Sequence, residues 1–287
     1  MSGQMTPLAH EWHDGPAPDA PVLVLLHGWS MDRRAWAPLL PWLTPHCRVL
    51  AIDLPGHGGA DWRAQEADFA VMCERVLAVA PPEALWLGWS LGGLVALQIS
   101  AQQPARVQAL TLLAATPCFV ARDDGFPAMP AATFAAFADR LATTPERTLA
   151  RFRQLLTAGA ANVRTLRERL AALDATARPP QPAALAAGLA WLRDIDLRGA
   201  LASLRPPAQL LLADNDALVP SALADWCARE LPHVAVLRLP AAGHAVHLEQ
   251  PKRVAEAYLA HWQRHVRRSP LAALGPVVAT ARGASSP

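Results

Sequence analysis

A serine stands between glycines at residues 88–92, where the sequence reads GWSLG. The apolar run at residues 84–87 predicts a strand before it, and residues 91–102 predict a helix after it. In that context a Gly-x-Ser-x-Gly segment forms a sharp turn that exposes the hydroxyl near the positive end of the helix. We therefore predict that Ser90 is a catalytic nucleophile; the simpler interpretation is a glycine-rich turn with an incidental serine.

A serine hydroxyl is barely ionised at neutral pH, so a nucleophilic serine needs a neighbouring base. His244 directly follows the last predicted strand, and His247, three residues later, is the alternative. The base in turn needs a carboxylate that fixes its tautomer. The segment ADND at residues 213–216 offers Asp216 and Asp214. We prefer His244 and Asp216, because Asp214 could instead cap the turn and His247 could merely pack at the start of a helix.

Attack on a carbonyl group leaves negative charge on its oxygen, which backbone N–H groups can stabilise in an oxyanion hole. The residue after the nucleophile, Leu91, is one expected donor. The loop after the first predicted strand reads HGW at residues 27–29, and Trp29 is the second expected donor. The alternative interpretation of Trp29 is a core aromatic residue.

These residues need a scaffold, and short apolar runs alternate with helical patterns along much of the chain. Strands are predicted at residues 21–26, 48–52, 84–87, 107–113, 209–212 and 234–237, and helices at residues 32–43, 64–79, 91–102, 221–230 and 249–266. The alternation predicts an α/β fold with a mostly parallel sheet covered by helices on both faces.

The strand pattern is interrupted by a long helical segment. Helices are predicted there at residues 130–143, 145–158, 162–176 and 182–192. We therefore expect a core formed by residues 1–117 and 198–268, with a helical cap insertion at residues 118–197. The tail at residues 269–287 is rich in Ala, Gly, Pro and Ser, and we expect it to be mobile.

Composition excludes several classes of protein. The chain has 287 residues, of which 52% are hydrophobic and 17% charged, which is ample for a large core. No apolar run approaches the roughly 18 residues of a membrane span, and the beginning of the chain does not resemble a signal peptide. A net charge of +2 gives no case for nucleic acid, and four cysteines without CxxC spacing favour neither zinc nor disulfides. We expect a cytoplasmic monomer without a metal.

Three segments carry a resemblance to the α/β-hydrolase superfamily, and within it to the pimeloyl-[acyl-carrier protein] methyl ester esterases of biotin synthesis. They read HGW at residues 27–29, DLPGHG at residues 53–58 and LWLGWSLGGLVA at residues 85–96. Shorter matches lie at residues 116–119, 121–123, 146–148 and 151–152. The chain order Ser, Asp, His also agrees with this superfamily.

The resemblance implies a serine carboxylesterase that cleaves the methyl ester of a pimeloyl chain carried on acyl carrier protein and releases methanol, without a cofactor. It implies the same triad, Ser90, Asp216 and His244. The substrate contacts that it implies are Trp29, Ser90, Leu91, Phe152, Arg153, Gln154, Leu155, Leu156 and His244.

The predicted cap also has an excess of positive charge. Residues 140–169 contain seven arginines and two acidic residues, a pattern that would attract an acidic carrier protein. The arginines that the resemblance implies for carrier binding are Arg147, Arg151 and Arg164. A fourth position falls near Glu168, with Arg167 beside it. An arginine-rich solvated surface without a partner is the simpler interpretation.

Two other functions stay open. Cap helices vary among enzymes of one fold, so a general short-acyl esterase or lactonase is the first alternative. A non-catalytic binding protein of the same fold is the second, although the complete set of Ser, Asp and His argues against it. A dehalogenase would need an acidic residue at the position of Ser90.

Overall fold

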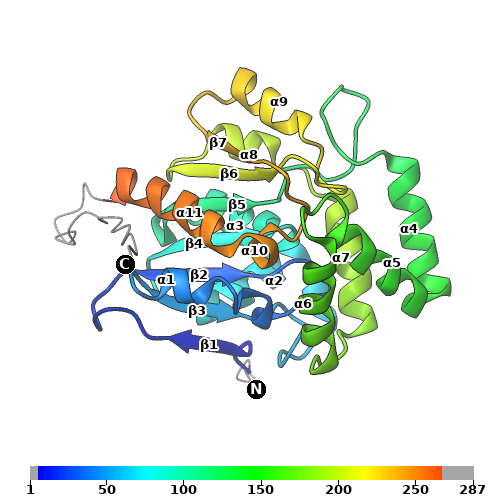
Figure 1. Ribbon diagram of the computed structural model, residues 1–287, viewed down its shortest axis with the longest axis horizontal. Helices are drawn as coiled ribbons and strands as arrows, with labels where there is room; N and C mark the ends of the chain where they lie inside the picture. Colours follow the sequence, from blue (N-terminus) through cyan, green and yellow to red (C-terminus); the bar gives the residue numbers. More distant parts are fainter. Residues whose placement is uncertain (1–5, 267–287) are drawn as a thin grey trace, which may run out of the picture.

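A seven-stranded sheet with the order β1-β3-β2-β4-β5-β6-β7 forms the centre of the computed structural model, which describes residues 6–266 (Figure 1). The strands are β1 (His10–His13), β2 (Val22–Leu26), β3 (Arg48–Ile52), β4 (Ala84–Trp89), β5 (Val107–Leu113), β6 (Ala208–Ala213) and β7 (Ala235–Leu239). All neighbouring strands are parallel except β1, which pairs with β3 in the antiparallel direction. The predicted α/β fold with a mostly parallel sheet is confirmed.

Helices cover both faces of this sheet, which is why its central strands are continuous apolar runs. On one face, α1 (Leu40–Leu43) packs against α11 (Pro251–Val266), and α11 contacts β5 and β6. On the other face, α3 (Leu91–Gln102) contacts β2, β4 and β5, and it packs against α2 (Phe69–Val79) and α8 (Arg198–Ala202). At the end of the sheet, α9 (Ala222–Glu230) contacts β7.

The strand order has a switch point that determines where a site can form. From β2 the chain passes to β3 on one side and then to β4 on the other side, so β2 and β4 are neighbours. In open parallel sheets, loops diverge at such a point and leave a crevice at the carboxyl ends of the strands. The loop after β2 and the turn at Ser90 both leave the sheet at this crevice.

The edge strand β1 and the short helix α8 were not predicted. Strand β1 reads HEWH and is mostly exposed, so it has no apolar run, and it is held by backbone pairing with β3. Two predicted helices are each divided into two pieces. Residues 32–43 form η1 (Arg33–Trp36) and α1, and residues 64–79 form η2 (Ala64–Ala67) and α2. The helix predicted at residues 249–266 begins at Pro251 as α11, after the separate short helix α10 (Val246–Glu249).

The physical reason for two of these helix boundaries is local. The carboxylate of Asp68, whose backbone is extended, accepts hydrogen bonds from the N–H groups of Ala70 and Val71 and begins α2 as its N-cap. Pro251 has no N–H group and begins α11. Hydrophobic periodicity continues across both breaks, so it does not reveal them.

Between β5 and α8 the chain forms four helices that lie together at one side of the sheet (Figure 1). They are α4 (Ala131–Thr143), α5 (Pro145–Thr157), α6 (Val163–Ala175) and α7 (Pro182–Asp194), close to the predicted bounds. The division into a core and a cap at residues 118–197 stays a prediction, and the tail at residues 269–287 lies outside the described residues. Within residues 6–266, no helix is both long and apolar enough to cross a membrane.

Candidate active site

Ser90 lies on a sharp turn between β4 and α3. Its φ is 54° and its ψ is −117°, a strained conformation for a residue with a side chain. Close backbone packing around the neighbouring glycines keeps Ser90 in this conformation. A Cβ atom on Gly88 would overlap the Gly92 carbonyl, and one on Gly92 would overlap the Leu26 carbonyl. The local sequence therefore forces the hydroxyl of Ser90 out above the carboxyl edge of the sheet.

Three side chains from separate loops form one chain of hydrogen bonds. The Nε2 atom of His244 lies 2.9 Å from the Oγ atom of Ser90. The Nδ1 atom of the same ring lies 2.8 Å from Oδ2 and 3.0 Å from Oδ1 of Asp216. Asp216 follows β6 and His244 follows β7, and both side chains are almost completely buried. The structure thus brings together the three residues predicted as a triad.

The alternative residues lie elsewhere. The carboxylate of Asp214 is directed to Arg238, with 2.7 Å between Oδ1 and Nε. The ring of His247 is buried against Trp36 and Trp89, and neither of its nitrogens has a hydrogen-bond partner among the described residues. Burial lowers the pKa of His247 to about 3. Asp214 thus contacts a different partner, and His247 serves as a packing residue.

The two backbone N–H groups predicted to form an oxyanion hole lie near Ser90. Leu91 is the first residue of α3, so its N–H has no acceptor inside the helix. Within residues 6–266, the N–H of Trp29 donates no hydrogen bond. The loop of Trp29 lies against the turn, because a Cβ atom on Gly28 would be 3.3 Å from the Cβ of Ser90. The geometry is compatible with the predicted oxyanion hole.

The loop of Trp29 rests on the buried ring of His27. This ring donates from Nδ1 to the Gly28 carbonyl oxygen at 2.9 Å and accepts at Nε2 from the N–H of Leu54 at 2.9 Å. Burial lowers the pKa of His27, so the ring is neutral and can accept the second bond. His27 therefore joins the loop after β2 to the loop after β3.

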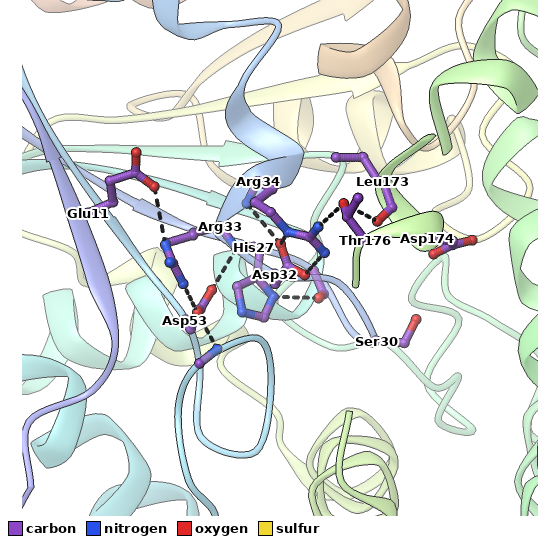
Figure 2. Close-up of polar contacts among 12 residues, drawn as sticks. Glu11, His27, Ser30, Asp32, Arg33, Arg34, Asp53, Leu173, Asp174 and Thr176 are labelled. Carbon is purple, nitrogen blue, oxygen red and sulfur yellow. Dashed lines mark hydrogen bonds and ion pairs between the residues drawn. The ribbon is translucent and has the colours of Figure 1, made fainter. Parts of the chain in front are cut away.

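A buried carboxylate strengthens the same junction (Figure 2). Asp53 accepts hydrogen bonds from the N–H groups of Arg33 and Gly59, both at 2.8 Å. It also forms an ion pair with the Arg33 guanidinium, which reaches on the other side to Glu11. Asp53 thus orders the two loops and has no contact with Ser90 or His244.

An apolar cavity beside Ser90 is lined by residues of α4, α5 and α7. Its volume is about 80 Å³, and most of its lining is aromatic or aliphatic. Phe152 and Leu155 of α5 line it together with Trp29, whereas Arg153, Gln154 and Leu156 do not. The rings of Trp29 and Phe152 meet edge to face, with centroids 4.8 Å apart. Such a lining suits an uncharged hydrocarbon chain.

The predicted carrier-binding arginines are on the outside of these helices. Arg147 and Arg151 are exposed on α5, and Arg151 donates to the side-chain oxygen of Gln154 at 3.0 Å. Arg164 on α6 is 90% exposed and forms an ion pair with Glu168 at 3.0 Å, so the Glu168 carboxylate partly offsets the positive charge of Arg164. A role of these arginines in binding a carrier stays a prediction.

One residue that supports the site was missed. The indole N–H of Trp89 donates to the backbone carbonyl of His244 at 3.0 Å, so the side chain before Ser90 holds the loop of the histidine. The two residues are 155 positions apart in the sequence. Spacing along the chain therefore carries no signal for this contact.

Comparisons with known proteins agree with this geometry. Residues 23–257 match the model of the alpha/beta hydrolase family. The chain is 40% identical over 237 residues to the pimeloyl-[acyl-carrier protein] methyl ester esterase of Aromatoleum aromaticum, covering 81% of this chain and 94% of that protein. It is 41% identical to the esterase of the same name from Methylococcus capsulatus, covering 82% and 92%. A hydrolase structure from Pseudomonas aeruginosa superposes with a TM-score of 0.75 at 26% identity, covering 88% of this chain and 93% of that one.

Proposed function

The chain belongs to the alpha/beta hydrolase family, and we propose that it is a serine carboxylesterase that hydrolyses the methyl ester of pimeloyl-[acyl-carrier protein]. The observation that carries the proposal is the hydrogen-bonded chain from Ser90 through His244 to Asp216 beside an apolar cavity. The curated relatives of that name, about 40% identical, support the choice of substrate. The products are methanol and pimeloyl-[acyl-carrier protein], a step of biotin synthesis. We also propose that the enzyme is cytoplasmic and monomeric.

The first half of the reaction transfers the acyl group to the enzyme. Ser90 Oγ attacks the ester carbonyl carbon while its proton passes to His244 Nε2. The N–H groups of Trp29 and Leu91 hold the negative oxygen of the tetrahedral intermediate. The intermediate collapses, His244 returns the proton to the methoxy oxygen, and methanol leaves an acyl-enzyme on Ser90.

The second half hydrolyses this acyl-enzyme. His244 now takes a proton from water, whose oxygen attacks the acyl carbon, and it then protonates Ser90 as the free acid leaves. Asp216 accepts a hydrogen bond from Nδ1 throughout, so it keeps Nε2 free to accept a proton and stabilises the charged ring. One water is consumed and one methanol released in each cycle.

The surroundings of the triad fit such a substrate in two respects. The apolar cavity suits the methylene chain, and it holds no charged side chain. Arg147 and Arg151 are on the exposed side of α5, whose buried side contributes Phe152 to the cavity. An acidic carrier protein on α5 would therefore lie close to the entry of its acyl chain.

The test compares pimeloyl methyl ester on acyl carrier protein with the free dimethyl ester of pimelic acid at several salt concentrations. We expect a higher kcat/KM for the carrier-bound ester, and we expect the preference to decrease as salt screens the arginines. Equal turnover of the two esters without a salt effect would contradict the carrier-bound substrate. That outcome would favour a general short-acyl esterase.

A further inference from the structure

The guanidinium of Arg153 joins α5 to the loop that carries Trp29. Its Nη1 atom donates to Ser30 Oγ at 2.8 Å, and its Nη2 atom donates to the Ser30 carbonyl oxygen at 3.3 Å. Ser30 is buried and is the residue next to Trp29. One cationic side chain thus binds both the hydroxyl and the carbonyl oxygen of Ser30.

Ser30 needs such support because its backbone is strained. Its φ is 59°, in the left-handed region that a residue with a Cβ atom rarely adopts. The conformation persists only where surrounding contacts outweigh its cost. The two hydrogen bonds from Arg153 are contacts of this kind, and they come from a helix 123 residues away in the chain.

The position of Arg153 is in turn fixed by α6. Asp174 accepts from Nε of Arg153 at 3.0 Å and from Nη2 at 2.9 Å, so its carboxylate meets two donors of the same guanidinium. Such bidentate pairs are stronger and more directional than single charged contacts. Asp174 therefore orients the guanidinium toward Ser30.

A second contact joins the same loop to the end of α6 (Figure 2). Arg34 donates from Nη1 to the hydroxyl of Thr176 at 2.5 Å. The same guanidinium pairs with Asp32, whose carboxylate also caps η1 by accepting from the N–H of Arg34. The segment after Trp29 is thus connected to α5 through Arg153 and to the end of α6 through Arg34.

The side chain of Trp29 is positioned by contacts with α7 and α4. Its indole N–H donates to the Leu185 carbonyl oxygen of α7 at 2.9 Å, and its ring packs edge to face on Phe137 of α4. The side chain of Trp29 and the backbone after it are therefore both positioned from outside the core. Among the described residues the backbone N–H of Trp29 donates no hydrogen bond, so it is available to the reacting oxygen.

We propose that Arg153, anchored by Asp174, is a positioning residue of the oxyanion hole, which keeps Ser30 in its left-handed conformation and so directs the N–H of Trp29 to the reacting oxygen. The inference rests on the proposed serine esterase function. The resemblance had implied a substrate contact for Arg153, but its guanidinium is directed to Ser30 and it does not line the apolar cavity.

The primary test is Arg153→Met, measured by steady-state hydrolysis of p-nitrophenyl acetate, a small ester that needs no carrier. Removing a whole oxyanion donor costs on the order of 100- to 1000-fold, and a displaced donor costs less. We expect kcat to fall about tenfold, while KM changes little, because the oxyanion exists only in the transition state. Affinity for phenylboronic acid, whose tetrahedral adduct on Ser90 places an oxygen in the oxyanion hole, should fall in parallel.

A rescue experiment separates positioning from general damage to the fold. Glycine adopts positive φ without the cost that serine bears, so Ser30→Gly in the Arg153→Met background should recover about fivefold in kcat. Arg153→Lys keeps the charge but cannot hold Ser30 and Asp174 together, so it should lose about threefold. If Arg153→Met does not fold, Asp174→Asn, which keeps the arginine and removes its anchor, should lower kcat in the same way.

The matched control is Arg193→Met on α7, because the Arg193 side chain pairs only with Asp194 among the described residues, and kcat should be unchanged. A raised KM with unchanged kcat would overturn the proposal in favour of a substrate contact by Arg153. No change at all, or a loss that Ser30→Gly does not recover, would also overturn it. Failure of the wild-type protein to cleave the carrier-bound ester, or an active Ser90→Ala variant, would instead contradict the proposed function.

Discussion

Replacing Asp216 by Asn tests the proton path of the triad with almost no change in shape. Oδ1 of Asp216 accepts hydrogen bonds from the N–H groups of Leu218 and Val219, at 2.8 and 3.1 Å. An asparagine would therefore keep its carbonyl oxygen at Oδ1 and place its NH₂ group at the position of Oδ2. That position lies 2.8 Å from Nδ1 of His244.

The substitution would change the tautomer of His244. The NH₂ group would lie 2.8 Å from Nδ1, closer than the retained oxygen at 3.0 Å, and favours that nitrogen as an acceptor. The proton then moves to Nε2, which donates to Ser90 instead of accepting from it. We expect kcat for p-nitrophenyl acetate at pH 7 to fall on the order of 10⁴-fold, or about 5.5 kcal/mol of activation free energy. The hydrogen bonds to Leu218 and Val219 are kept, so the melting temperature should change little.

The matched control is Asp214→Asn. Asp214 pairs with Arg238 and does not contact His244, so this variant should keep kcat within about threefold of wild type, because an exposed pair contributes little. An Asp216→Asn variant within tenfold of wild type would refute the tautomer argument. Equal losses for the two variants would show that Asp216 has no special role.

Three further predictions concern the nucleophile, the buried histidines and the surface arginines. Ser90→Ala should lose at least about 10⁴-fold in kcat with an unchanged circular dichroism spectrum, and near-wild-type activity would exclude the serine mechanism. Burial lowers the pKa of His57 and of His247 to about 3, so the folded state resists protonation and stability falls as pH drops below 6.5. Urea unfolding at pH 5 should show a loss of about 2 kcal/mol for each ring relative to pH 7, and a flat profile would contradict neutral burial. Arg147→Glu with Arg151→Glu should raise KM for the carrier-bound ester about tenfold at low salt, and a rise that high salt does not reduce would contradict an electrostatic role.

The sequence predicts the parts of the fold that depend on neighbouring residues. The apolar runs of the central strands and the glycines at residues 88–92 are local signals, and the strands and the turn at Ser90 lie where they are expected. Strand β1 was missed because its stability comes from pairing with β3 and not from its own pattern. The divisions of two helices and the start of α11 at Pro251 were missed because hydrophobic periodicity continues across them.

The candidate site divides in the same way. The sequence by itself places a serine, two histidines and two aspartates after the right strands, because each of these positions follows from a short local pattern. Which of them meet was decided by the tertiary structure, since the register of β6 and β7 directs Asp216 and His244 to Ser90 and leaves Asp214 to Arg238.

The contacts that support the site belong to the tertiary structure alone. Trp89 reaches His244 across 155 residues, and Arg153 reaches Ser30 across 123. The first contact joins the end of β4 to the loop after β7, and the second joins α5 to the loop after β2. No periodicity along the chain encodes either contact. Local sequence patterns therefore determined Ser90 and its turn. Long-range packing determined which residues contact Ser90 and which contacts position the loop of Trp29.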